Sequence, residues 1–149
     1  LSEETAFMMT DLMQTVVDRG TGGSIRWKYN FYHPAAGKTG TTQGWTDAWF
    51  VGFSTQIAAG AWFGIDDPQV SLGKGADGTR AALPAWARFM KTAHDSLYYS
   101  KEEFQQPDKV KTFSICQVSK EKPTPLCPLE NELFILGTDP SRLCKIHRR

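Results

Sequence analysis

The N-terminal stretch of the chain has the apolar spacing of an amphipathic helix. Met8, Leu12 and Val16 recur at intervals of four residues, so they form one stripe along a helix. Glutamates near the start suit a first helical turn, and Gly20 with the GTGG run suits a helix end. We therefore expect a helix over residues 2–19 whose apolar stripe packs into a core.

Two alternating segments in the middle of the chain predict a β-hairpin. In residues 47–54 the large side chains Trp49, Val51 and Phe53 occupy alternate positions, as they would on one face of a strand. A second apolar segment, residues 57–65, comes after a short polar turn. The two segments are expected to pair as antiparallel strands.

A second helix is predicted over residues 79–94, after a long loop rich in glycine and aspartate. Pro84 suits its first turn, because proline lacks the N–H that a helix interior needs. The apolar side of this helix is expected to consist of Ala82, Trp86, Phe89 and Met90.

Composition and charge narrow the class of protein. The chain has 149 residues, of which 40% are hydrophobic and 22% charged, as in a globular domain with its own core. The formal net charge of +1 gives no reason to expect a nucleic-acid partner. No apolar run suits a transmembrane helix, and no signal peptide opens the chain. Because the first residue is Leu1, we expect a piece of a longer protein.

The character of the sequence changes near residue 100. Prolines and charged residues become frequent, and no regular apolar period is visible. We therefore divide the chain into a globular part, residues 1–98, and a linker with a small irregular extension, residues 99–149.

The most specific chemical feature is the run GKTGTT that starts at Gly37. Its glycines let a ligand lie against the backbone of a strand edge that faces a cleft. Lys38 supplies a positive charge, and Thr39 and Thr41, two positions apart, direct their hydroxyls to the same side. We expect the cation and both hydroxyls on one face, as a seat for a carboxylate. The backbone N–H of Thr41 is placed to stabilise an oxyanion.

A phosphate loop is the other interpretation of Gly-Lys-Thr, and the surrounding residues argue against it. Tyr32 stands where that motif needs a glycine, and a strand pattern occurs where it needs a helix.

Lys-Thr-Gly on a strand is the third signature motif of the penicillin-binding transpeptidases and serine β-lactamases, and this chain resembles that family. The segments DAWFVGF, GAWFGIDDPQVSLGKG and GTRAALPAWARFM resemble the region after the motif in bifunctional, class A penicillin-binding proteins. The segment TAFMMTDLMQTVVDRGTGG resembles the helix and loop before the motif in those proteins. The resemblance covers residues 4–95 and implies an incomplete piece of an α+β fold, with antiparallel strands flanked by helices.

The resemblance also implies an activity and site residues. Such enzymes are peptidoglycan D,D-transpeptidases, in which a serine takes an acyl group from the D-Ala-D-Ala end of one stem peptide and passes it to another; β-lactams trap the serine. It implies catalytic roles for Lys38, which organises the proton network, and for the Thr41 N–H, half of an oxyanion hole. The stem peptide would be bound by Lys38, Thr39, Gly40 and Thr41.

The nucleophile of such an enzyme is missing from this chain. Family members carry Ser-x-x-Lys and then Ser-x-Asn before Lys-Thr-Gly, but no Ser-x-Asn occurs here. Ser-x-x-Lys runs start at Ser71 and Ser119, and both come after Lys38. We therefore expect the isolated chain to be inactive. The serine, a glycosyltransferase domain and a membrane anchor are expected upstream, on the extracytoplasmic side of the membrane, alongside other cell-wall synthesis proteins.

Two other functions stay open at this point. The chain would also suit a β-lactamase or D-Ala-D-Ala carboxypeptidase, although the segments after the motif and the long extension argue against these. A non-catalytic penicillin receptor or scaffold domain is the alternative from another class. The residues upstream of Leu1 would separate the three.

The three cysteines, Cys116, Cys127 and Cys144, all lie in the late segment. The family places it outside the cytoplasm, where disulfides persist, and we favour a Cys116–Cys127 disulfide. With His147 the cysteines also offer four soft ligands, so a metal site is an alternative, although only Cys144 and His147 are close in sequence, and free thiols are a third possibility. We assign no metal ion or other cofactor to the chain.

Overall fold

The computed structural model describes residues 1–67 and 69–147. The chain divides into two compact units, one of Met9–Phe104 and one that joins Leu1–Met8 with Gln105–Arg149. The sequence-based boundary at residues 98 and 99 lies a few residues before the point at which these units separate. In the part of the chain that the structure describes, no helix is both long and apolar enough to cross a membrane.

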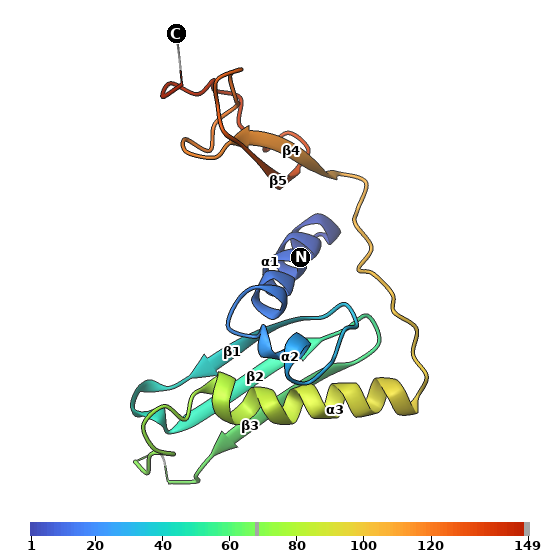
Figure 1. Cartoon of the computed structure of the whole chain (residues 1–149), viewed down its shortest axis with the longest axis vertical. Helices are drawn as coiled ribbons and strands as arrows, with labels where there is room; N and C mark the ends of the chain where they lie inside the picture. The colour runs from blue at the N-terminus through green and yellow to red at the C-terminus, as the bar shows by residue number, and fades with distance from the viewer. Residues whose placement is uncertain (68, 148–149) are drawn as a thin grey trace. The chain divides into compact units, whose positions relative to one another are not determined.

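The larger unit is built on a three-stranded antiparallel sheet (Figure 1). Its strands are β1 (Ala36–Thr41), β2 (Asp47–Phe53) and β3 (Ala58–Gly64), in the order β1-β2-β3. The predicted hairpin is therefore confirmed as β2 and β3. Strand β1, which holds the Lys-Thr-Gly residues, lies at one edge of the sheet.

The two faces of β2 differ in a way that side-chain size alone does not indicate. Ala48 and Phe50 are buried, whereas the alternate residues Trp49 and Val51 are exposed. Strand pleating puts the two pairs on opposite faces. The core of this unit therefore lies on the Phe50 side of the sheet.

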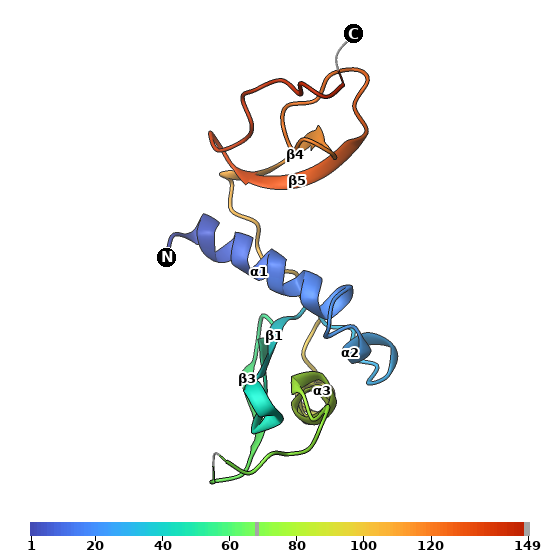
Figure 2. The same ribbon diagram turned by 90° about the vertical axis from the view of Figure 1, so that its left-hand side faces the viewer.

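Helix α3 (Leu83–Ser96) covers the buried face, as Figure 2 shows with the sheet seen almost edge on. A π-helical turn, η2 (Gly78–Ala82), leads into it. Trp86 of α3 is buried, and its ring lies 4.9 Å from that of Phe50. Its indole N–H donates to the carbonyl of Ala59 across 3.0 Å, which ties the helix to β3.

The predicted second helix is confirmed, with Pro84 in the first turn of α3. Ala82, Trp86 and Met90 are buried as expected. Phe89 is 53% exposed, since the helical period puts it at the border of the side that Trp86 and Met90 bury.

Helix α1 (Glu3–Asp18) matches the predicted helix, but the packing expected of its apolar stripe is wrong. Leu12 is 60% exposed, and the buried residue of this helix is Val17, next to the stripe. Only the last turn of α1 joins the core of the larger unit, and Val17 is the residue that this turn directs inward. A short helix, α2 (Ser24–Trp27), comes next and adds Ile25 to the same core.

The smaller unit contains a β-hairpin, so it is more regular than the small irregular extension that we expect from the sequence. Its strands β4 (Val110–Cys116) and β5 (Leu129–Ile135) pair antiparallel along their full length. Phe113 on β4 and Phe134 on β5 meet edge to face with ring centroids 6.1 Å apart. Such cross-strand aromatic contacts stabilise a hairpin, and the prolines fall outside the two strands.

Candidate active-site wall around Lys38

The candidate site is the unpaired edge of β1. Just beyond that strand, the N–H of Thr42 donates to the carbonyl of Asp47 across 3.1 Å, so Thr42 directs its backbone polar groups toward the neighbouring chain segment. Successive residues of a strand direct these groups to opposite edges. The N–H of Thr41 therefore points to the edge that no described strand covers, where an added chain or an oxyanion can accept from it.

Lys38 and Thr39 lie on opposite faces of the sheet, so the expectation of a single face for cation and hydroxyls is wrong. Lys38 is paired with the exposed Val51, and Thr39 with the buried Phe50. Paired residues share a face, which separates the two side chains. The pleat causes this separation, because the residues are neighbours in one strand.

The long stem of Lys38 nevertheless returns its charge to the edge. The Lys38 ammonium donates to the carbonyl of Thr39 across 2.9 Å and to the Thr39 hydroxyl across 3.3 Å. The cation and the first hydroxyl thus meet beside the unpaired backbone. Such a pairing of an ammonium with a hydroxyl is suited to a carboxylate, which accepts from both.

The second hydroxyl, that of Thr41, is held from the side of η2. The backbone N–H of Gly78 donates to it across 3.0 Å. Because the oxygen already accepts this bond, its own proton is available for donation to a ligand. Gly78 reaches this position because it has no side chain: a Cβ atom would lie 2.4 Å from the carbonyl oxygen of Trp49.

A third hydroxyl joins the group, and sequence reasoning missed it. Thr21 lies in the loop after α1, and its hydroxyl oxygen is 3.4 Å from that of Thr39. The only signal in the sequence is the small, hydroxyl-containing GTGG run, which by itself is typical of any loop.

The two glycines of the motif have different surroundings. A Cβ atom on Gly37 would lie 2.9 Å from the Phe50 ring, so packing against the core requires this glycine. Gly40 is on the face of Lys38, and its Cβ atom would approach the Cβ of Trp49 to 3.3 Å. The need to leave room for a ligand can therefore explain the glycine at position 40 but not the one at position 37. The sequence-based expectation was that both glycines leave such room.

The two Ser-x-x-Lys runs are parts of turns. Ser71 donates to the carbonyl of Gly44 across 2.6 Å and accepts from the N–H of Gly73. Ser119 accepts from the N–H of Glu121 across 3.3 Å. Neither serine begins a helix, which agrees with their dismissal as nucleophiles.

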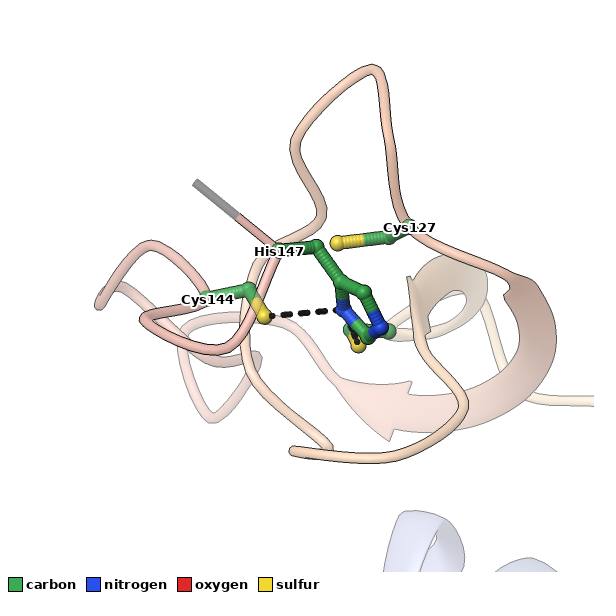
Figure 3. A group of neighbouring side chains, drawn as sticks. Cys127, Cys144 and His147 are labelled. Atoms are coloured by element: carbon green, nitrogen blue, oxygen red, sulfur yellow. Dashed lines mark hydrogen bonds between the residues drawn. The ribbon is translucent and has the colours of Figure 1, made fainter. Parts of the chain in front are cut away.

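A second group of reactive side chains lies in the smaller unit. No disulfide joins Cys116 to Cys127. Instead, both cysteines lie close to Cys144 and His147, and the ligand atoms of all four residues lie within 4.8 Å of one another. Figure 3 shows the Cys127 and Cys144 side chains directed toward His147, with a hydrogen bond between the Cys144 sulfur and the ring. A hydrogen bond from the Ser119 side chain, helped by His147, lowers the pKa of Cys144 to about 5, and burial raises that of Cys127.

An antiparallel sheet that packs on a helix and carries Lys-Thr-Gly on its edge strand is the arrangement of the serine β-lactamase and penicillin-binding protein class. The family model described as the penicillin binding protein transpeptidase domain matches residues 1–90, and the one described as the penicillin-binding protein 1A C-terminal domain matches residues 106–149. The chain therefore belongs to the penicillin-binding protein transpeptidase family.

Individual relatives agree with this assignment. The chain is 37% identical to penicillin-binding protein 1A of Aquifex aeolicus over 134 residues, which are 90% of this chain and 18% of the relative. It is 34% identical to penicillin-binding protein 1A of Clostridium tetani, over 99% of this chain and 19% of the relative. The crystal structure of penicillin-binding protein 1A from Haemophilus influenzae matches with a TM-score of 0.85 and 29% identity, over 97% of this chain and 22% of that one. The chain thus spans about a fifth of the length of these proteins.

Proposed function

We propose that the protein containing this chain is a peptidoglycan D,D-transpeptidase and that β1 forms one wall of its active site. The observation that carries the proposal is the unpaired edge of β1, where the Thr41 N–H points outward beside the Lys38 ammonium and the Thr39 hydroxyl. A D-Ala-D-Ala end presents a carboxylate and a reacting carbonyl close together. This edge offers groups for both.

Each residue of the wall has a separate task in this proposal. Lys38 and the hydroxyls of Thr39 and Thr41 bind the terminal carboxylate, and Gly40 leaves room for the peptide beside the strand. The Thr41 N–H donates to the oxygen that becomes negative when the serine attacks, the second donor being the N–H of that serine. The stem peptide then lies along β1 as an added strand.

The rest of the enzyme lies outside this chain in the proposal. The acylated serine and the Ser-x-Asn residues come from upstream, together with a glycosyltransferase domain and a membrane anchor. The site faces the extracytoplasmic side, where peptidoglycan is cross-linked, with other cell-wall synthesis proteins as partners. β-Lactams bind at the same wall, because they present a carboxylate next to a strained amide.

The test uses the full-length protein with lipid-linked peptidoglycan precursor and measures released D-Ala and cross-linked peptide dimers. Lys38→Met keeps the side-chain stem and removes the charge, so we expect dimer formation to fall about 10- to 100-fold. Lys74→Met is the matched control, an exposed lysine in a loop of the same unit, and should leave dimer formation unchanged. If the unaltered protein released D-Ala without forming dimers, it would be a carboxypeptidase. If it formed neither product, it would be a non-catalytic scaffold. Either result would overturn the proposal.

A further inference from the structure

Three segments that are separate in the sequence meet at the cysteine cluster. Cys116 ends β4, Cys127 lies just before β5, and Cys144 and His147 belong to the segment after the hairpin. The Nδ1 atom of His147 lies 3.4 Å from the sulfur of Cys116 and 3.4 Å from that of Cys144. Cys127 completes the group, since all four ligand atoms lie within 4.8 Å of one another.

The two nitrogen–sulfur distances match edges of a tetrahedron around a small metal ion. Zinc–sulfur bonds of about 2.3 Å and zinc–nitrogen bonds of about 2.0 Å give nitrogen–sulfur edges of about 3.5 Å and sulfur–sulfur edges of about 3.8 Å. The observed 3.4 Å contacts lie close to the first value. A Cys116–Cys127 disulfide would use two sulfurs and leave the convergence of Cys144 and His147 unexplained.

Hydrogen bonds from neighbouring residues fix the positions of the cysteine and histidine ligands. The N–H of Thr124 donates to the Cys127 sulfur across 3.2 Å, and that of Ser119 donates to the Cys116 sulfur across 3.5 Å. The Thr124 hydroxyl donates to the carbonyl of His147 across 2.6 Å. Amide and hydroxyl donors of this kind stabilise thiolates and orient the ligands of metal sites.

The smaller unit also has a structural need for a cross-link. Its sheet is a single two-stranded hairpin, which is marginally stable without further support. The segment after the hairpin is tied to the rest through the backbone of Lys122. The N–H of Lys122 donates to the carbonyl of Arg142, and its carbonyl accepts from the N–H of Cys144, both across 2.9 Å. Small units of this type depend on disulfides or a structural metal.

We propose that Cys116, Cys127, Cys144 and His147 bind one Zn²⁺ ion as a closed structural site. Three thiolates and one imidazole are a typical zinc ligand set, and four protein ligands leave no open position for chemistry. The burial of Cys116 and Cys144 shields the site from solvent. The ion would hold the C-terminal segment against the hairpin. This proposal differs from the expectation from the sequence, which favours a Cys116–Cys127 disulfide and no metal.

The test uses the whole 149-residue chain, purified with a reductant, and Zn²⁺ and Co²⁺ as probes. We expect one Zn²⁺ per chain by elemental analysis and, after exchange, the intense visible bands of tetrahedral Co²⁺ with a thiolate-to-metal charge-transfer band. Cys144→Ser should lose these bands, whereas Ser141→Ala, an exposed serine in the same segment, should keep them. The Co²⁺ spectrum of the unaltered chain is informative even if Cys144→Ser fails to fold.

Two outcomes would overturn the site. One is a chain purified without reductant that holds no metal and gains two hydrogens on reduction, which would show a disulfide. The other is a reduced chain that binds neither ion at micromolar concentration and whose thiols all react freely with a thiol reagent.

Discussion

The amide N–H of Gly78 and the hydroxyl of Thr41 are joined by a 3.0 Å hydrogen bond between η2 and the edge strand. This bond links the packing of the larger unit to its proposed chemistry. The turn that begins α3 fixes the orientation of a side chain that contacts the substrate in our proposal. A substitution in this turn should therefore change both the stability of the unit and the position of the Thr41 hydroxyl at the substrate-binding edge.

Gly78→Ala should destabilise the larger unit by about 1–3 kcal/mol, because a Cβ atom there would overlap a backbone carbonyl that has no room to move. Gly60→Ala is the control, since its nearest neighbour would be the Val51 side chain at an ordinary 3.7 Å. Urea unfolding monitored by tryptophan fluorescence measures both, because all five tryptophans lie in this unit. Equal midpoints for the two variants would contradict the described position of η2.

Trp86→Ala should cost about 3–5 kcal/mol, because it empties the space between α3 and the sheet and removes the bond to Ala59. Trp27→Ala is the matched control, with a side chain that is 72% exposed, and should stay within about 0.5 kcal/mol. A small effect of Trp86→Ala in the same unfolding experiment would show that the core lies elsewhere.

His33 should make the larger unit less stable in mild acid. Burial is the main cause that lowers its pKa, electrostatic interactions with His94 and Lys101 act in the same direction, and its Nδ1 atom has no hydrogen-bond partner among the described residues. The unfolded chain therefore takes up this proton first as the pH falls below about 6.5, so stability that is present above that pH is lost on acidification.

Replacing His33 by phenylalanine tests this effect, because a ring at this position still stacks on Phe31. The fall in Tm between pH 7.5 and pH 5.5 should be smaller in His33→Phe than in the unaltered chain. The same fall in both would exclude His33 as the group responsible.

Local patterns were sufficient to predict the elements that form next to one another in sequence. The hairpin of β2 and β3 is predicted by alternation and a short turn, and the helix around Trp86 by its period and Pro84. In contrast, the choice of Val17 over the apolar stripe of α1 depends on which neighbours the fold supplies, and sequence spacing does not contain that information.

The candidate sites show the same division. The Lys-Thr-Gly run identified Lys38 and Thr41, but the contribution of Thr21 arises from a contact across eighteen positions. The sequence indicates the three cysteines and His147 as a possible metal site but favours a disulfide, because the ligands come from three segments that only the β4–β5 hairpin brings together. Paired ligands at close spacing, the usual sequence signal of zinc, are present only at Cys144 and His147.

Binding of a carboxylate at the Lys38 edge of β1 is tested directly by one double comparison. The acylation rate of the full-length protein is measured with a fluorescent penicillin and with its methyl ester, in the unaltered protein and in Lys38→Met. Esterification should slow acylation about 10- to 100-fold in the unaltered protein and have little further effect in Lys38→Met, because that variant already lacks the charge that binds the carboxylate. Equal sensitivity to esterification in both proteins would contradict carboxylate binding at this edge.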